Sequence, residues 1–122
     1  MKFLLLALLP FIGAAVAADL PPENASRMLK VLLTATADGD YESFQKEGTP
    51  AFQSGITKQV FSTVSAQLSP LLKPGYDAQF LTALRQSNLD VYLWKITPKS
   101  GKDQFVAKLV VEDGKAAGFW IN

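Results

Sequence analysis

The stretch between residues 24 and 37 carries apolar side chains at the spacing of one helix face. Asn24 precedes the apolar positions, and Asp38-Gly39 follows them. An amide side chain is a common N-cap, and a glycine commonly ends a helix. The pattern therefore predicts an amphipathic helix over residues 25–37, whose buried face is formed by Met28, Leu29, Leu32, Leu33 and Ala35.

Three further helical segments are expected after Gly39. Each follows a polar residue whose side-chain oxygen can accept a hydrogen bond from the first turn: Asp40, Thr49 and Thr57. Pro50 then occupies a first helical position, where its missing N–H is not needed. The helix after Thr57 is expected to stop before Pro70, because proline removes a hydrogen bond within a helix.

After Gly75 the apolar period changes to two, which indicates strands. Asp113-Gly114 predicts a two-residue primed turn within a hairpin. Residues 76–85 fit a strand, although 78–84 also fit a helix. Helices followed by a meander predict an α+β fold, in which N-terminal helices pack on a curved four-stranded antiparallel sheet of strands 76–85, 89–97, 105–112 and 115–121.

The Asp113-Gly114 turn also predicts the register of the last hairpin, because it pairs Glu112 with Lys115. In an uninterrupted ladder, one face then holds Val106, Lys108, Val110, Ala117, Phe119 and Ile121. The opposite face holds Phe105, Ala107, Leu109, Val111, Ala116, Gly118 and Trp120. A four-residue loop at 98–101 adds Tyr92, Trp94 and Ile96 to this second face, whereas a loop one residue different would reverse this assignment.

Neither face of the predicted sheet is polar throughout. Helices on one side cover only one face, so the other needs a partner chain, a ligand or the first strand curling over it. Ordinary core packing of the aromatic residues is the alternative interpretation. The candidate ligand or interface residues are Tyr92, Trp94, Phe105, Leu109 and Trp120.

Residues 1–18 have the three parts of a cleavable signal peptide. Lys2 is positively charged, residues 3–16 are almost wholly apolar, and Ala15 and Ala17 are small residues where a signal peptidase cuts. The apolar run is shorter than the roughly 20 residues that a membrane-spanning helix needs. We expect cleavage after Ala17 or Ala18, export to the periplasm or the exterior, no membrane span after cleavage, and a single mature domain over residues 19–122.

Composition excludes several kinds of site. The chain has no cysteine and no histidine, which excludes disulfides, thiolate ligands and histidine-based triads or zinc sites. Loss of Lys2 leaves 11 of the 12 basic residues against 11 acidic ones, a balance that does not favour nucleic acid. Asp38 and Asp40 flank Gly39, but the remaining ligands of a calcium loop do not follow. No metal and no other cofactor is predicted.

The order of several short segments resembles the nuclear transport factor two-like superfamily, which has a cystatin-like fold, and in particular its small secreted bacterial members. These segments are Ala37 to Tyr41 with Phe44, Thr49 to Phe52, Thr57 with Phe61, Val91 to Lys95, and Asp113 to Phe119. The resemblance implies a cone-shaped domain and a homodimer formed through the sheet. The family contains isomerases, dehydratases and binding proteins, so the fold alone does not give the function. The catalytic His-Asp and Tyr-Asp sets of its enzymes have no clear counterpart in this chain.

Asp90 and Tyr92 are the weak catalytic candidates, because alternate residues of a strand share a face and a carboxylate beside a phenol suits acid–base chemistry. Asp90 also fits a plain role at the start of a strand. The favoured interpretation is a non-enzymatic exported domain that binds a small apolar ligand or a protein partner. The alternatives are a small isomerase-like or lyase-like enzyme that uses Asp90 and Tyr92, or a purely structural dimer.

The signal-peptide assignment predicts a mass difference between precursor and exported protein. The exported chain should lack residues 1–17 or 1–18. Intact-mass measurement of protein recovered from the exported fraction checks this, and a mass that still contains Met1 to Ala17 would contradict it.

Overall fold

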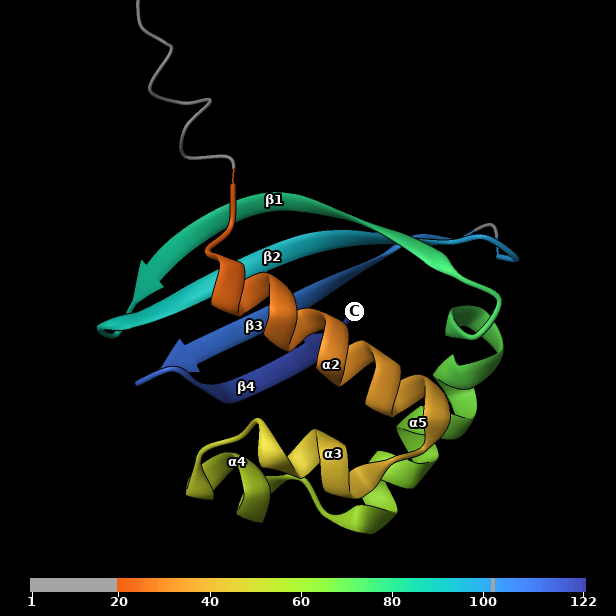
Figure 1. The fold of residues 1–122 in the computed structure, drawn as a ribbon, viewed down its shortest axis with the longest axis horizontal. Coiled ribbons are helices and arrows are strands. Elements are labelled where there is room, and N and C mark those ends of the chain that lie inside the picture. Colours follow the sequence, from red (N-terminus) through yellow and green to blue (C-terminus); the bar gives the residue numbers. More distant parts are fainter. Residues whose placement is uncertain (1–19, 102) are drawn as a thin grey trace, which may run out of the picture.

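The computed structural model describes residues 20–101 and 103–122, so the predicted signal peptide lies outside the described residues. Helices come first and strands follow, which confirms the expected α+β fold class (Figure 1). The helices are α2 (Glu23–Asp38), α3 (Tyr41–Lys46), α4 (Pro50–Gly55) and α5 (Lys58–Leu72). The strands are β1 (Tyr76–Gln86), β2 (Leu89–Pro98), β3 (Phe105–Glu112) and β4 (Lys115–Ile121).

Helix α2 begins two residues earlier than predicted. Pro22 occupies the N-cap position, and its carbonyl oxygen accepts a hydrogen bond from the Ser26 N–H at 3.1 Å. Asn24 therefore lies inside the helix, where its side chain accepts a hydrogen bond from Arg27 at 3.1 Å. The prediction that Asn24 caps the helix was wrong, because a proline carbonyl can start a helix without any side-chain cap. Gly39 ends the helix in the left-handed conformation, with φ of 70°.

The three other predicted caps are confirmed. Each side-chain oxygen accepts a hydrogen bond from the backbone N–H three residues later. The Ser43 N–H donates to Asp40 at 3.1 Å. The Phe52 N–H donates to Thr49, and the Val60 N–H donates to Thr57, both at 3.2 Å. The Ser43 hydroxyl also donates to Asp40. These hydrogen bonds favour the charged carboxylate and lower the pKa of Asp40.

Helix α5 continues past Pro70 to Leu72, which corrects the predicted end. The last turn closes after the proline through a hydrogen bond from the Lys73 N–H to the Ser69 carbonyl at 2.9 Å. The Ser69 hydroxyl also donates to the Ala37 carbonyl of α2 at 2.7 Å. Burial of Leu72 and these bonds fix the turn, and the proline removes only one intrahelical bond.

The strands form one antiparallel sheet in the order β1-β2-β3-β4. Residues Asp113 and Gly114 have positive φ angles of 51° and 77°, which confirms the predicted primed turn. The β1–β2 connection is also a two-residue turn, formed by Ser87 and Asn88 with φ angles of 52° and 64°. The sequence analysis did not identify this second turn, because it contains no glycine.

The predicted register of β3 and β4 fails after the first residues. Glu112 pairs with Lys115 and Val111 with Ala116, but Val110 then pairs with Gly118. Ala117 is therefore the extra residue of a β-bulge, which reverses the faces of all later residues of β4. Phe119 and Ile121 consequently pack against the core beneath the helices, and Trp120 lies on the opposite face.

The core lies between the helices and one face of the sheet. Helix α2 crosses this face (Figure 1), and the core side chains of β2 and β3 pack beneath the helices, namely Trp94, Ile96, Ala107 and Leu109. Phe44 of α3 is the centre of an aromatic cluster, with ring centroids 5.3 Å from Phe52, 4.8 Å from Phe61 and 6.2 Å from Phe119. This cluster joins the short helices to α5 and to β4.

Replacement of Gly114 by alanine should destabilise the protein by about 1 kcal/mol, because the turn requires a positive φ. A Cβ at this position would meet no atom within 4 Å, so the cost comes from the backbone alone. Gly55→Ala is the matched control, since Gly55 lies in helix α4 and its Cβ would also be free of contacts. Urea titration should show a loss for Gly114→Ala only, and equal midpoints for the two variants would contradict the turn.

Candidate functional site

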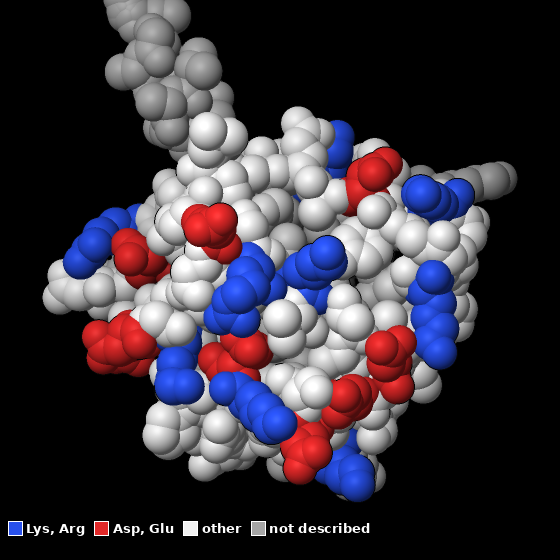
Figure 2. Space-filling view, in the orientation of Figure 1, with Lys and Arg blue, Asp and Glu red and all other residues white. Residues whose placement is uncertain are grey.

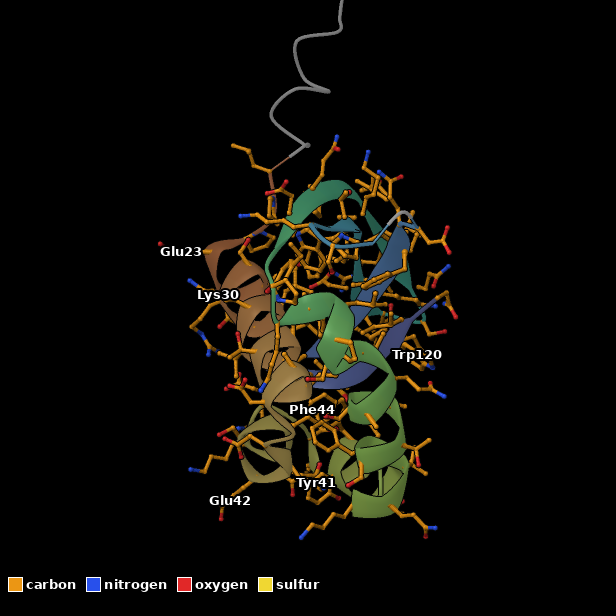
Figure 3. The ribbon with its side chains drawn as sticks, turned by 90° about the vertical axis from the view of Figure 1, so that its right-hand side faces the viewer. Glu23, Lys30, Tyr41, Glu42, Phe44 and Trp120 are labelled. Atoms are coloured by element: carbon orange, nitrogen blue, oxygen red, sulfur yellow. The ribbon has the colours of Figure 1, made fainter. Side chains whose placement is uncertain are left out.

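The five predicted ligand or interface residues do not form one surface. Trp94 and Leu109 are 3% and 0% exposed beneath the helices, and Tyr92 and Phe105 are half-buried against the same core. Trp120 is 49% exposed on the other side of the sheet. Figure 3 shows Trp120 and the α2 residues Glu23 and Lys30 on opposite sides of the molecule. The prediction of one shared face was wrong, because the bulge at Ala117 reverses β4.

The face of the sheet opposite the core carries an apolar row across all four strands. Leu84 pairs with Val91, Val91 with Val110, and Val110 with Gly118, so these residues share this face. Val91 is only 1% exposed although it lies outside the helix-covered core cluster. The described helices pack on the other face and along the β4 edge (Figure 1). We refer to this surface, formed by Leu84, Val91, Leu93, Val110 and Trp120, as the helix-free face.

Trp120 is held flat on the helix-free face by two neighbours. Lys108 is its partner on β3, and the Lys108 Nζ lies 5.1 Å from the centroid of the indole ring. A cation at this distance over an indole is an attractive contact. The ring also covers Gly118, where any Cβ would collide with it. Glycine at 118 therefore leaves room for the ring, and the ring in turn covers backbone that the glycine exposes.

Charges on the surface are mixed. Figure 2 shows basic and acidic side chains interspersed over the side that carries α2. Arg27 and Glu47 form an ion pair at 3.1 Å, and Arg85 and Asp90 form another at 3.2 Å. Such exposed pairs contribute little to stability. The apolar row on the helix-free face is therefore a more distinctive surface feature than the charges on the α2 side.

Asp90 and Tyr92 do share a face, as predicted, but their surroundings differ from an acid–base site. The Asp90 carboxylate is half-exposed and pairs with the Arg85 guanidinium at 3.2 Å. Burial raises the pKa of Tyr92, and the nearby Asp90 charge raises it further. Neither residue lines the cavity beside α2 or the cavities beside β4. The arrangement lacks the enclosed, water-excluding setting in which a carboxylate acts as a general acid or base.

A cavity of about 550 Å³ lies between α2 and the beginning of β1. Leu29 and Trp94 give it an apolar floor, and Lys30, Tyr76 and Asp77 supply polar groups. Burial alone raises the pKa of Tyr76, so its hydroxyl is held in a partly desolvated position. A largely apolar cavity with a few polar groups is the usual form of a small-molecule site.

The sequence analysis missed this cavity and the apolar row. The cavity depends on how closely α2 approaches β1, which no local pattern specifies. The row was partly visible, because Val106, Lys108 and Val110 were assigned to one face correctly. The missing information was the position of Trp120, which follows from the bulge.

No protein-family model matches the sequence, and no curated protein matches it. Among solved structures, the chain is similar to an uncharacterized cystatin-fold protein from Novosphingobium aromaticivorans. The two share 13% sequence identity with a TM-score of 0.43, over 84% of this chain and 99% of that chain. The α+β architecture itself rests on the helices and strands described above.

Two other kinds of feature can be addressed for the described part of the chain. Within residues 20–101 and 103–122, no helix is long and apolar enough to cross a membrane. The same residues contain no group of three or more acidic side chains arranged to hold a metal ion.

The cavity predicts a specific response to alkaline pH. Burial raises the pKa of Tyr76 in the folded state, so the folded protein should lose stability as the pH rises above about 10, the ordinary tyrosine value. Tyr76→Phe should reduce this loss, because phenylalanine cannot ionise. Thermal melts at neutral and alkaline pH measure the difference, with Tyr92→Phe for comparison since burial also raises the Tyr92 pKa. An identical alkaline loss in wild type and Tyr76→Phe would contradict the burial of this hydroxyl.

Proposed function

We propose that this chain is an exported, non-enzymatic domain that binds another protein through the helix-free face. The observation that carries the proposal is the apolar row across the four strands, with Leu84 and Trp120 exposed by 43% and 49%. The outer face of an antiparallel sheet ordinarily presents polar side chains to water. Exposed apolar side chains on one face, with an aromatic residue among them, are typical of protein contact surfaces.

A second copy of this chain is the partner that we propose for this face. Two copies related by a two-fold axis would place the same apolar row against itself, as two sheets pack face to face. The resemblance to the nuclear transport factor two-like superfamily supports this arrangement, since it implies dimers formed through the sheet. Membership of that superfamily is part of the proposal.

The enzymatic alternative receives less support from the geometry. Asp90 is paired with Arg85 at a half-exposed position, and Tyr92 is packed against the core. Neither group lines the cavity beside α2 or the cavities beside β4. A binding role therefore fits the observed surroundings better than acid–base catalysis.

A small ligand is a second candidate, and the cavity between α2 and β1 favours it. Its volume of about 550 Å³ suits a small molecule, and Trp94 offers an aromatic surface beside the Tyr76 hydroxyl. Lys30 and Asp77 on the same cavity could orient polar groups of such a ligand. This role is compatible with a dimer, because the cavity lies on the helix side of the sheet.

Native mass spectrometry and sedimentation of the exported chain test both ideas together. We expect a dimer whose dissociation is concentration-dependent, and Leu84→Glu should shift it to monomer because it places a charge within the apolar row. Trp120→Lys should act in the same direction. A small molecule retained by the protein would appear as added mass, and it should be lost in a Trp94 variant that still folds.

Leu20→Glu is the matched control, since Leu20 is a large exposed apolar residue outside the sheet. It should leave the dimer unchanged, and circular dichroism should be native for all of these surface variants. A wild-type chain that remains monomeric at every concentration would overturn the self-association proposal. Equal dissociation of Leu20→Glu and Leu84→Glu would show that the effect is not specific to the helix-free face.

A further inference from the structure

The outer edge of β4 carries backbone groups that no neighbouring strand uses. Val106 and Asn122 exchange both backbone hydrogen bonds, at 2.8 and 2.9 Å. Alternate residues of an antiparallel strand point their N–H and C=O groups in opposite directions. The backbone groups of Gly118 and Trp120 therefore face β3, and those of Phe119 and Ile121 face outward, away from the sheet.

The same edge already accepts a short extended segment at its other end. Gly48 forms a parallel bridge with Ala116. The Thr49 N–H donates to the Ala116 carbonyl at 2.9 Å, and the Ala116 N–H donates to the Glu47 carbonyl at 2.8 Å. Pro50 then turns the chain away into α4, so this pairing stops at Ala116. Beyond that residue the edge continues without an added strand among the described residues.

An apolar groove follows the open part of this edge. Two cavities of about 260 and 330 Å³ lie between β4 and helices α4 and α5, and both are lined by Ile56, Phe119 and Trp120. On the α5 side, Val60 and Val64 are exposed by 54% and 37% although both are apolar. The groove thus has a wall of aliphatic side chains on the helices and a line of unused hydrogen-bonding groups on the strand.

We propose that this groove binds an extended peptide segment of a partner protein, which adds as a strand to the β4 edge. The outward groups of Phe119 and Ile121 would pair with its backbone, and its alternate apolar side chains would contact Val60 and Val64. Residues 117–121 offer a length of about 16 Å, at about 3.3 Å per residue, which suits a segment of about five residues. This site meets the helix-free face at Trp120, but it uses the strand edge and the helices rather than the apolar row, and it does not depend on the proposed dimer.

The geometry favours an isolated segment over a second copy of this chain. In a second copy, β4 is flanked by that copy's own α4 and α5, so an edge-to-edge pair would have to accommodate the helices of both copies. The start of α2 lies beside β1, at the opposite edge of the sheet from the groove (Figure 1). An extended segment without flanking helices fits the space between β4 and α5.

Nuclear magnetic resonance of the isotope-labelled exported chain tests the proposal with a defined probe. The probe is a synthetic heptapeptide of alternating threonine and valine with blocked ends. We expect it to shift the amide signals of Phe119 and Ile121 and to slow the hydrogen exchange of these two amides. The same peptide with N-methylated valines should fail, because it cannot donate the backbone hydrogen bonds of a strand.

Two exposed variants separate the groove from the helix-free face. Val64→Asp should weaken binding of the peptide by at least about tenfold, because it places a charge on the aliphatic wall. Leu84→Glu lies on the helix-free face and should leave peptide binding unchanged, whatever its effect on self-association. Retained binding by Val64→Asp, with signal shifts confined to Leu93 and Lys108, would overturn the proposal.

Two further results would also overturn it. Unchanged exchange of the Phe119 and Ile121 amides at millimolar peptide would show that the edge does not pair with this class of segment. Protection of these amides that rises with protein concentration in the absence of peptide would show that a second copy occupies the edge instead. The first result leaves the proposed dimer untouched, and sedimentation of Leu84→Glu distinguishes the self-association in the second result from a dimer through the helix-free face.

Discussion

Two hydrogen bonds anchor Ala116 to the Glu47–Thr49 segment, just before the bulge that determines how the rest of β4 lies in the sheet. They hold Ala116 against the core, and the bulge at Ala117 follows immediately. With the bulge, Phe119 and Ile121 pack beneath the helices and Phe119 joins the Phe44 cluster. A straight strand would bury Trp120 and Gly118 in their place and would expose two large apolar side chains. The position of Trp120 on the helix-free face and the outward direction of the Phe119 and Ile121 backbone groups follow from this irregularity.

Local features of the fold could be predicted from the sequence because their causes are local. A cap at Asp40 or Thr57 needs only one oxygen and one backbone N–H within the same turn, and the Asp113-Gly114 turn needs only two residues that tolerate positive φ. The bulge could not be predicted in this way, because no turn or cap residue marks it and the neighbouring Ala116 pairs with Gly48, far away in the sequence. The predicted end of α5 was wrong because Ser69 and Leu72 hold the turn after Pro70 through contacts with other elements, which are also distant in the sequence.

The candidate residues show the same division between local and non-local information. Tyr92, Trp94, Phe105 and Leu109 were correctly placed on one face of β2 and β3, where the ladder is regular. Whether this face meets helices or water could not be decided from alternation, because both faces of the sheet are apolar. The helices cover the more aromatic face, which buries most of the expected interface residues and leaves the aliphatic row of Leu84, Val91 and Val110 on the other side.

The sheet has an apolar surface on each side, and the two tryptophans of the chain lie on opposite sides of it. Trp94 is enclosed by protein, whereas Trp120 meets solvent beside a lysine ammonium. Indole emission depends on the polarity around the ring and on access of quenchers from solution. The protein therefore contains two intrinsic optical probes without any label: emission from Trp94 follows the integrity of the helix-covered core, and emission from Trp120 follows events at the outer surface.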